Sequence, residues 1–354
     1  MKLLLVTDAW RPQINGVVTA LVKMKDHLER DGFEVVVIHP GLFRCVPLLG
    51  YPEIRLAVSP WRTMRRLFIS EDPDFIHIAT EGPLGWNARM LCRRYDRRFT
   101  ASYHTHFQLY AHARMRPFLR PVQALLRAFH DATTCTMVAT PSLKRELKAN
   151  GFGGLALWPL GVDTSVFVRN TRSQKATLSR PVFLFFSRLA PEKNPEEFLK
   201  LELPGTKLVI GDGPERKRLE ARFGAQVTFV GYKHGQELVD WLSISDVMVF
   251  PSRSETFGLV ILEALACGIP VAAHDVMGPR DIIDNGVDGF LGNDLKKAAL
   301  ACLSLDRAKC REKALRYSWD ASALAFKANL VRASRARATA SDSSGGSFRA
   351  GISP

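Results

Sequence analysis

Short apolar runs alternate with amphipathic stretches along most of this 354-residue chain. Apolar runs of about four to eight residues bounded by polar or turn residues are typical of buried strands, and amphipathic stretches are typical of helices. A helical pattern at 17–30 follows the first run after Asn15-Gly16. The predicted strands lie at 3–7, 34–39, 75–78, 100–103 and 137–140 and, after Gly161, at 182–187, 207–210, 227–230, 247–251 and 271–274.

This alternation predicts an α/β fold with two Rossmann-like, doubly wound parallel-sheet domains in tandem. Strands separated by helices form parallel sheets through right-handed crossovers, and the length suits two such domains. Ligands bind outside the carboxyl ends of such strands, so two facing domains would share one cleft. The tail at 334–354 is of low complexity and is predicted to be disordered.

The chain is strongly basic, with a formal net charge of +14 that is concentrated in the first half. Residues 1–160 hold 22 Lys and Arg against 13 Asp and Glu, whereas residues 161–330 hold 23 against 21. Part of the excess positive charge lies at residues 61–68, a stretch that also contains the large apolar residues Met64, Leu67 and Phe68. The candidate basic surface comprises Trp61, Arg62, Arg65, Arg66, Arg114 and Arg116.

Three interpretations of this surface compete: solvated arginine, a nucleic-acid patch, or a face for anionic lipid. The sequence contains no recognisable nucleic-acid module, so we expect no nucleic-acid partner. Basic residues mixed with large apolar ones suit a membrane interface better, because each Lys or Arg near an anionic bilayer contributes about 1 kcal/mol. We therefore expect peripheral contact with an anionic membrane, with scattered surface arginine as the plain alternative.

Cysteine usage and hydropathy bear on localisation. The six cysteines show neither CxxC pairing nor the His spacing of a zinc site, which indicates reduced thiols and the cytosol. No segment reaches the roughly 18–20 apolar residues of a membrane span, and the first apolar run is too short for a signal peptide. We expect a cytoplasmic protein, peripheral on the inner face of the membrane.

The stretch at 250–270 is the most informative for chemistry. A polar loop follows a predicted strand, and a helix begins near Phe257-Gly258. Gly258 would let an anion such as a diphosphate approach the N–H groups and dipole of that helix. Glu255 would lie beside the anion and accept hydrogen bonds from sugar hydroxyls, while Glu263, two turns on, could accept both hydroxyls of a ribose. Alternatively, Glu255 only complements the helix dipole and Glu263 is a solvated helix residue.

This stretch resembles the signature of glycosyltransferase family 4, whose members are retaining enzymes with the GT-B fold. Glu255 and Glu263 match the family's Glu-x7-Glu motif, and the adjoining Phe257-Gly258 is intact. The resemblance extends over most of the chain. It implies a GT-B fold with a nucleotide-diphosphate sugar bound between two Rossmann-like domains.

Further segments carry the resemblance through the second half. Arg188 and Lys193 match the family's Arg-x4-Lys loop, whose two cations would hold the donor's diphosphate. Segments 211–215 and 227–231 are similar to the family's turns near the nucleoside, and segment 161–167 resembles its interdomain marker. The implied donor-binding residues are Gly16, Arg188, Lys193, Gly211, Gly231, Tyr232, Glu255, Phe257, Gly258, Leu259 and Glu263.

The segment at 317–320 is like the start of the family's last helix, which crosses back to the first domain. The resemblance therefore implies an acceptor-binding domain at 1–160 that is completed by a helix at 318–333. It implies a nucleotide-sugar-binding domain at 161–317. The stretch from Pro195 to Pro204 leaves little room for that domain's usual first helix, which we expect to be shortened.

Residues 77–85 and 102–107 are similar to one branch of the family. That branch contains GDP-mannose-dependent α-mannosyltransferases and glycolipid enzymes like the sulfoquinovosyl- and glucuronosyl-diacylglycerol synthases. It implies that His104 lies at the cleft end of its strand and touches the donor sugar; a satisfied core histidine is the alternative, and His106 is a weaker candidate. Many relatives carry two glycines where this chain has Asn15-Gly16, a departure that affects how backbone N–H groups approach the phosphate or acceptor.

The implied catalytic residues are His104, Arg188, Lys193 and Glu255. Cleavage of a glycosyl–phosphate bond builds negative charge on the departing diphosphate, which the two cations and the helix N-terminus would stabilise. No Asp-x-Asp metal motif precedes a strand end, so we expect no metal and no cofactor besides the nucleotide-sugar substrate. The resemblance implies same-face attack with retention, and domain closure is expected because each half supplies part of the site.

The sequence leaves the donor and the acceptor open. UDP-glucose, UDP-glucuronate and GDP-mannose are all candidate donors. We expect a membrane lipid such as diacylglycerol as acceptor, in glycolipid biosynthesis, with α-mannosyl transfer to a soluble or cell-envelope saccharide as the alternative. A GT-B-type epimerase or phosphorylase would share the fold, and a basic nucleic-acid-binding protein is the alternative outside enzymes.

Overall fold

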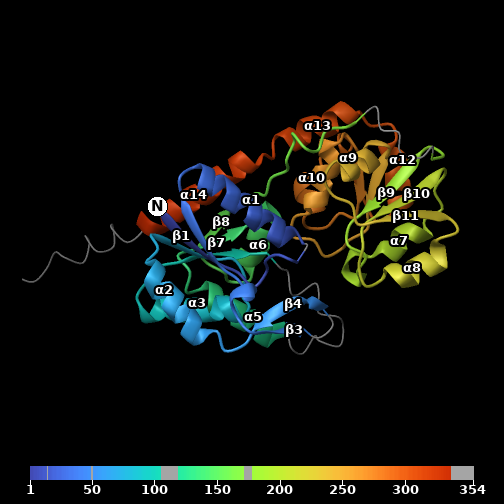
Figure 1. Ribbon diagram of the computed structural model, residues 1–354. Coiled ribbons are helices and arrows are strands. Elements are labelled where there is room, and N and C mark those ends of the chain that lie inside the picture. Colours follow the sequence, from blue (N-terminus) through green and yellow to red (C-terminus); the bar gives the residue numbers. More distant parts are fainter. Residues whose placement is uncertain (14, 49–50, 105–118, 171–177, 336–354) are drawn as a thin grey trace, which may run out of the picture.

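The computed structural model describes residues 1–13, 15–48, 51–104, 119–170 and 178–335. They form two α/β domains, one from the first half of the chain and one from the second (Figure 1). Each domain contains a six-stranded sheet in which every neighbouring pair of strands is parallel. The prediction of two Rossmann-like parallel-sheet domains is confirmed.

The N-terminal sheet has the strand order β2-β1-β5-β6-β7-β8. Its strands are β1 (Lys2–Val6), β2 (Glu34–Ile38), β5 (Phe75–Ile78), β6 (Thr100–Tyr103), β7 (Cys135–Val138) and β8 (Leu155–Leu157). The helices of this half are α1 (Gly16–Arg30), α2 (Trp61–Glu71), α3 (Pro83–Arg94), α5 (Leu119–His130) and α6 (Pro141–Ala149). An antiparallel hairpin of β3 (Cys45–Leu48) and β4 (Tyr51–Ala57) is inserted between β2 and α2.

The C-terminal sheet repeats this topology with the order β11-β10-β9-β12-β13-β14. Its strands are β9 (Val182–Phe186), β10 (Thr206–Ile210), β11 (Val227–Gly231), β12 (Val247–Phe250), β13 (Val271–Ala273) and β14 (Gly289–Leu291). Its helices are α7 (Pro195–Lys200), α8 (Arg216–Phe223), α9 (Gly235–Ser243), α10 (Leu259–Ala266), α11 (Pro279–Ile282), α12 (Leu295–Cys302) and α13 (Arg307–Leu315). At six residues, α7 is short, which confirms that expectation.

The last helix, α14 (Trp319–Arg335), lies against the N-terminal domain, where it packs on α1 and β7 (Figure 1). The indole N–H of Trp158 donates to the hydroxyl of Ser322 at 3.0 Å. Phe326 is fully buried, and its ring packs edge-on against His77 at 4.8 Å. The chain therefore passes between the two halves twice.

Met64 and Phe68 of α2 are core residues, which corrects the expectation that they face a membrane, whereas Ile69 is exposed. Met64 and Phe68 are buried, and Trp61 is partly buried against the same core. Packing uses the apolar face of this amphipathic helix and leaves the basic face to solvent. The exposed side chains of α2 include those of Arg62, Arg65 and Arg66.

Some predicted features lie outside the described residues: Arg114, Arg116, His106 and the tail from 336 to 354. In the described part of the chain, every helix is too short or too polar to cross a bilayer.

Candidate functional site

A cavity of about 510 Å³ lies between the two domains. One wall belongs to α1 of the N-terminal domain, and the other belongs to α10 and the turn after β11. Its lining includes Arg11, Thr19, Lys23, the linker residues 161–163, Tyr232, Lys233, Leu259, Glu263 and Trp319. Three predicted donor-binding residues, Tyr232, Leu259 and Glu263, therefore share one cavity.

The N-terminus of α10 opens toward this interdomain region. Its N-cap, Gly258, has a φ of +99°, a conformation that L side chains rarely adopt. No described side chain caps this helix. The N–H of Ile261 donates to the carbonyl of Gly258 at 2.9 Å, and the N–H groups of Leu259 and Val260 at the helix start could bind an anion. The neighbouring Phe257 is buried and packs edge-on against Tyr317 at 6.3 Å, which fixes the entry to the helix.

The start of α1 lies beside the start of α10. A Cβ atom placed on Gly16 would lie 3.7 Å from the side chain of Leu259. Asn15 caps α1, because its side-chain oxygen accepts a hydrogen bond from the N–H of Val18 at 3.0 Å. The Asn15-Gly16 departure therefore has a structural reason: Asn15 satisfies one N–H group of α1 itself.

Lys193 and Glu255 form an ion pair on the C-terminal side of the cleft, with Nζ and Oε2 2.5 Å apart. Lys193 ends a 3-10 turn, Pro191–Lys193, after β9, and Glu255 lies in the loop between β12 and α10. Both side chains are mostly buried, with 18% and 16% of their surface exposed. The hydroxyl of Ser254 also donates to the carbonyl of Glu192 at 3.1 Å, so the two loops are held together.

Arg188 lies in the same loop as Lys193 and is partly exposed. The path of this loop depends on Gly211, which has a φ of +143°. A Cβ atom on Gly211 would lie 2.0 Å from the carbonyl oxygen of Ser187, a distance that excludes any side chain. The N–H of Gly211 donates to the carbonyl of Gly231 at 3.0 Å, so these two glycines connect the turns that follow β10 and β11.

Glu263 lies on the second turn of α10 and keeps partial exposure to the cavity. Burial raises the pKa of its carboxyl group to about 7. Near neutral pH this group exists in both protonation states. Hydrogen bonds from a ribose diol would stabilise the ionised form and lower that pKa.

Tyr232 lies at the mouth of the same cavity. Its side chain is half exposed, and its ring stacks on that of His234, with centroids 6.2 Å apart. Because the ring is exposed and faces the cavity, it offers a surface on which a nucleobase could pack.

His104 follows β6 at the boundary between the domains. Its backbone carbonyl accepts a hydrogen bond from the hydroxyl of Thr256 at 2.9 Å, and Thr256 adjoins Glu255. Its Nε2 atom is buried and finds no hydrogen-bond partner in the described part of the chain. Burial lowers the pKa of His104 to about 4, so the ring is neutral at physiological pH. An unpaired buried nitrogen argues against a satisfied core histidine.

A hydrogen-bonded junction that the motifs did not reveal lies behind the Lys193–Glu255 pair. Oε1 of Glu197 accepts from Nε2 of His274 at 3.0 Å and from Arg253 at 3.3 Å. The side chain of Asn194 donates to Oε2 of the same carboxylate. The other ring nitrogen of His274 lies 3.2 Å from the carbonyl oxygen of Gly292. The ring of His274 therefore links the carboxylate of Glu197 to the backbone at Gly292.

The described residues contain no cluster of three or more His, Cys, Asp or Glu side chains with the geometry of a metal site. Cationic groups on this side of the cleft come instead from Arg188, Lys193 and the first turn of α10.

Two Rossmann-like parallel-sheet domains that face each other across a cleft are the architecture of a GT-B glycosyltransferase. The chain belongs to glycosyltransferase family 4. A family model described as "Glycosyltransferase Family 4" matches residues 14–166, and one described as "Glycosyl transferases group 1" matches residues 168–319. The predicted family, fold and enzyme class are confirmed.

Relatives from two kingdoms support this assignment. A GDP-mannose-dependent alpha-mannosyltransferase of Mycobacterium tuberculosis is 31% identical over 82% of this chain and 83% of its own length. Sulfoquinovosyl transferase SQD2 of Arabidopsis thaliana is 32% identical over 84% of this chain and 66% of its own. An alpha-monoglucosyldiacylglycerol synthase of Streptococcus pneumoniae is 27% identical over 86% and 78%.

Among solved structures, sucrose-phosphate synthase from Thermosynechococcus elongatus superimposes with a TM-score of 0.78. The superposition covers 95% of this chain and 99% of that one, at 21% sequence identity. This likeness concerns the fold.

Proposed function

We propose that this glycosyltransferase moves a hexosyl group from a nucleotide-diphosphate sugar to a membrane lipid such as diacylglycerol, with retention of configuration. The observation that carries the donor half is the Lys193–Glu255 pair beside the uncapped start of α10. A diphosphate in this place would accept hydrogen bonds from Lys193, from Arg188 and from the N–H groups at the start of α10. Glu255 would then be released to accept hydrogen bonds from the sugar hydroxyls.

The remaining donor contacts follow from the cavity. The nucleoside would occupy the space beside Tyr232, with its ribose diol bound by Glu263. Nε2 of the neutral His104 ring would pair with a hydroxyl of the sugar. In this assignment residues 161–317 bind the donor, while residues 1–160, together with the returning helix at 318–333, bind the acceptor.

The chemistry is electrostatic in origin. As the glycosyl–phosphate bond breaks, the bonding electrons pass to the diphosphate, and Arg188, Lys193 and the α10 terminus stabilise that charge. The acceptor hydroxyl attacks the anomeric carbon from the same face and gives its proton to the departing phosphate oxygen. With these cations in place, we propose that the reaction needs neither a metal ion nor another cofactor.

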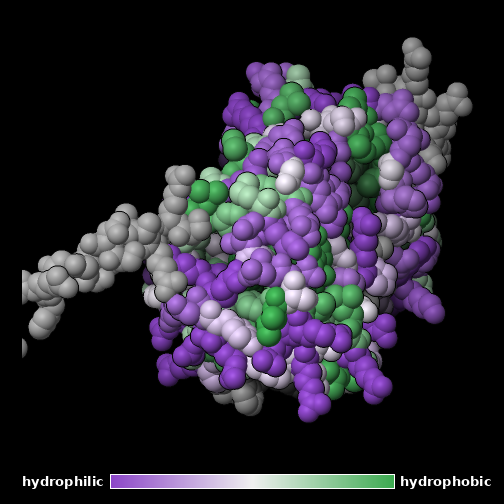
Figure 2. Space-filling model, turned by 60° about the vertical axis from the view of Figure 1, so that its left-hand side comes forward, coloured by the Kyte–Doolittle hydropathy of each residue, from purple (hydrophilic) through white to green (hydrophobic). Residues whose placement is uncertain are grey.

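The lipid acceptor is supported by the surface of the N-terminal domain. On α5, Leu125 is 53% exposed and lies between the exposed Arg120 and Arg127. Figure 2 shows hydrophobic patches between hydrophilic side chains on one face of the molecule. Such a mixed surface suits peripheral contact with an anionic bilayer at the cytoplasmic face. The synthase of Streptococcus pneumoniae, a relative along most of the chain, is named for a diacylglycerol product.

A second candidate is α-mannosyl transfer from GDP-mannose to a saccharide. The observation in its favour is the 31% identity to a GDP-mannose-dependent alpha-mannosyltransferase.

A donor panel tests both candidates. UDP-glucose, UDP-glucuronate and GDP-mannose are incubated separately with the protein and either a membrane lipid extract or a saccharide acceptor, and nucleotide release and new glycolipid are measured. The proposal predicts a glycolipid with one donor, together with sedimentation on anionic liposomes at low salt. Nucleotide release only with a saccharide acceptor, and no liposome binding, would favour the second candidate and contradict the first.

A further inference from the structure

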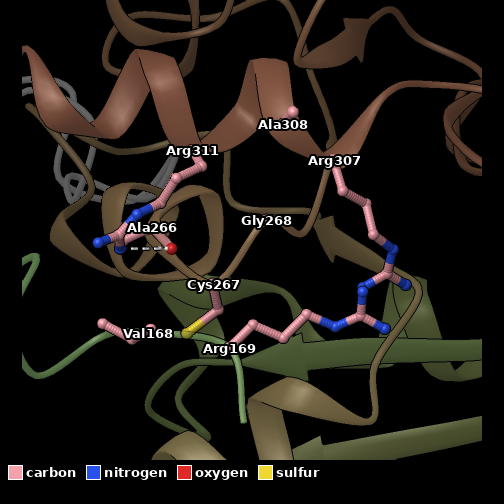
Figure 3. Close-up of a pocket in the computed structure, with 8 residues that line it drawn as sticks. All are labelled: Val168, Arg169, Ala266, Cys267, Gly268, Arg307, Ala308 and Arg311. Atoms are coloured by element: carbon pink, nitrogen blue, oxygen red, sulfur yellow. Dashed lines mark hydrogen bonds between the residues drawn. The ribbon is translucent and has the colours of Figure 1, made fainter. Parts of the chain in front are cut away.

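A second pocket, of about 260 Å³, lies at the opposite end of α10 from the donor cleft (Figure 3). It is formed where the linker after residue 167, the end of α10 and the start of α13 meet. The lining residues are Val168, Arg169, Ala266, Cys267, Gly268, Arg307, Ala308 and Arg311. Three of them are arginines, and none is acidic.

Two of the arginines extend toward each other. Figure 3 shows the guanidinium groups of Arg169, from the linker, and Arg307, from α13, side by side at one end of the pocket. The side chain of Arg169 is exposed, and its Nε atom reaches the carbonyl oxygen of Ser243 only at 3.5 Å. Like charges at this proximity are unfavourable unless an anion lies between or beside them.

Arg307 is anchored but incompletely satisfied. Its Nη2 atom donates to the carbonyl of Ser245 at 2.9 Å and to Oδ1 of Asp246 at 2.7 Å. Its Nη1 atom is buried and has no acceptor among the residues that the structure describes. Burial and the neighbouring Arg169 lower the pKa of Arg307, although Asp246 acts in the opposite direction.

Nearby carboxylates do not neutralise the pair. Asp246 is shared between Arg307 and Arg180, whose Nη1 atom lies 2.5 Å from it. The exposed Asp306 caps α13 by accepting from the N–H of Ala308 at 2.8 Å.

Arg311 shapes the pocket floor. It donates to three backbone carbonyls, those of Thr164, Phe167 and Ala266, at 2.7, 2.5 and 2.8 Å. These bonds connect the linker to the end of α10. The bond to Ala266 also satisfies a carbonyl at the C-terminus of that helix. The backbone beside the Arg169–Arg307 pair is therefore held in place by Arg311.

We propose that this pocket binds a phosphate group between Arg169 and Arg307, at a site separate from the donor cleft. The planar guanidinium fork matches phosphate oxygens in a two-pronged geometry. Since one water occupies about 30 Å³, the cavity holds a phosphate with part of its hydration. A phosphomonoester, either free in solution or as a lipid headgroup, meets the same requirement.

The test is the binding of inorganic phosphate, measured by calorimetry on matched variants. Lys193→Gln weakens phosphate binding at the donor site, and the further change in affinity when Arg169 is also replaced reports the arginine pocket. Adding Arg169→Gln to this chain is expected to weaken phosphate binding by at least about tenfold, the effect of losing a charge-assisted hydrogen-bond pair. Arg222→Gln, at an arginine exposed on α8, is the control and should leave binding unchanged. Equal thermal midpoints establish that the variants are folded.

Unchanged affinity after Arg169→Gln would overturn the proposal, as would the absence of saturable phosphate binding in the Lys193→Gln chain. Vesicles of phosphatidylcholine with phosphatidic acid identify the source of the phosphate. If it is a headgroup, Arg169→Gln reduces sedimentation with these vesicles, and inorganic phosphate competes. If it is a free ion, the two chains sediment equally and differ only in phosphate binding.

Discussion

Glu263 places a carboxyl group with a pKa of about 7 on the wall of the interdomain cavity. Its ordinary value would be 4.5, and burial is the cause of the difference. Burial therefore disfavours the ionised carboxyl, and hydrogen bonds from the hydroxyls of a ribose would favour it.

This environment predicts a pH-dependent stability effect of Glu263→Gln. Below about pH 4.5 the carboxyl is protonated in both states; as the pH rises to 7, the unfolded chain loses its proton first, so the folded state loses stability. At about 1.4 kcal/mol per pH unit, the full difference is roughly 3 kcal/mol. Urea unfolding should show Glu263→Gln more stable than the parent by up to that amount at pH 8 and nearly equal at pH 4. A stability difference between Glu263→Gln and the parent that is the same at both pH values would contradict this prediction. Glu312→Gln, on the surface of α13, is the control.

At this scale the motif spacing predicted which charged residues share a cleft, because Lys193 and Glu255 both follow strands of one parallel sheet. It did not predict the pKa of Glu263, since the burial of this residue depends on the folded chain, in which the distant Gly161 and Trp319 line the same cavity. The interpretation of Met64 and Phe68 as interfacial was wrong, because sequence alone does not show what covers the apolar face of α2.

Among the elements, the short helix α7 carries Glu197, whose carboxylate joins the loops on either side of the Lys193–Glu255 pair. Its carboxylate holds Asn194, which follows Lys193, and Arg253, which precedes Glu255 by two residues. His274, from the end of β13, buries this junction with only 1% of its side chain exposed. Glu197 is thus a positioning residue for both loops of the proposed diphosphate site.

Removing this carboxylate should impair the reaction without touching the substrate. We expect Glu197→Ala to lower kcat/KM at least about tenfold, mainly through kcat, because the two loops lose their common anchor. The neighbouring Glu196→Ala is a matched control, since Glu196 pairs with Lys200, Arg218 and Arg222, away from both loops. Steady-state kinetics in which the two variants behaved alike would remove Glu197 from this role.

The apolar rhythm predicted the long strands but not their exact ends. The strand expected at 137–140 is Cys135–Val138, because Thr140 instead caps α6 by accepting from Leu143. The three-residue strands β8 and β14 and the β3–β4 hairpin were missed, since each is too short or too polar to form a recognisable run.

For the whole molecule, the double crossing between the halves limits how the domains can move. Val162 donates to the carbonyl of Tyr317 at 2.8 Å, so the two crossing segments run side by side. A Cβ atom on Gly161 would lie 2.6 Å from the backbone of Trp319, which leaves no room for a side chain there. A closure motion would turn about this narrow junction.

The anchor of the returning helix is Phe326, whose loss should destabilise the protein. Phe326→Ala leaves a cavity beside Trp158 and His77 and is expected to cost about 3–5 kcal/mol. Leu324→Ala, on the same helix but 65% exposed, should cost less than about 0.5 kcal/mol. Chemical unfolding of the two variants compares them directly, and equal losses would show that α14 is not anchored through Phe326.

At this scale the carboxyl-end rule for parallel sheets correctly predicted where the cavity would lie. Donor and acceptor identity were beyond the sequence, because exposed rings such as Tyr232 and backbone groups recognise many bases.

The central claim is that the Lys193–Glu255 side of the cleft holds the donor diphosphate and sugar during transfer. Nucleotide release and glycolipid formation by the parent chain, Glu255→Ala and the surface control Glu312→Ala test it most directly. We predict that Glu255→Ala lowers turnover at least about 100-fold with unfolding unchanged, while the control matches the parent. Normal turnover by a folded Glu255→Ala protein would contradict the account.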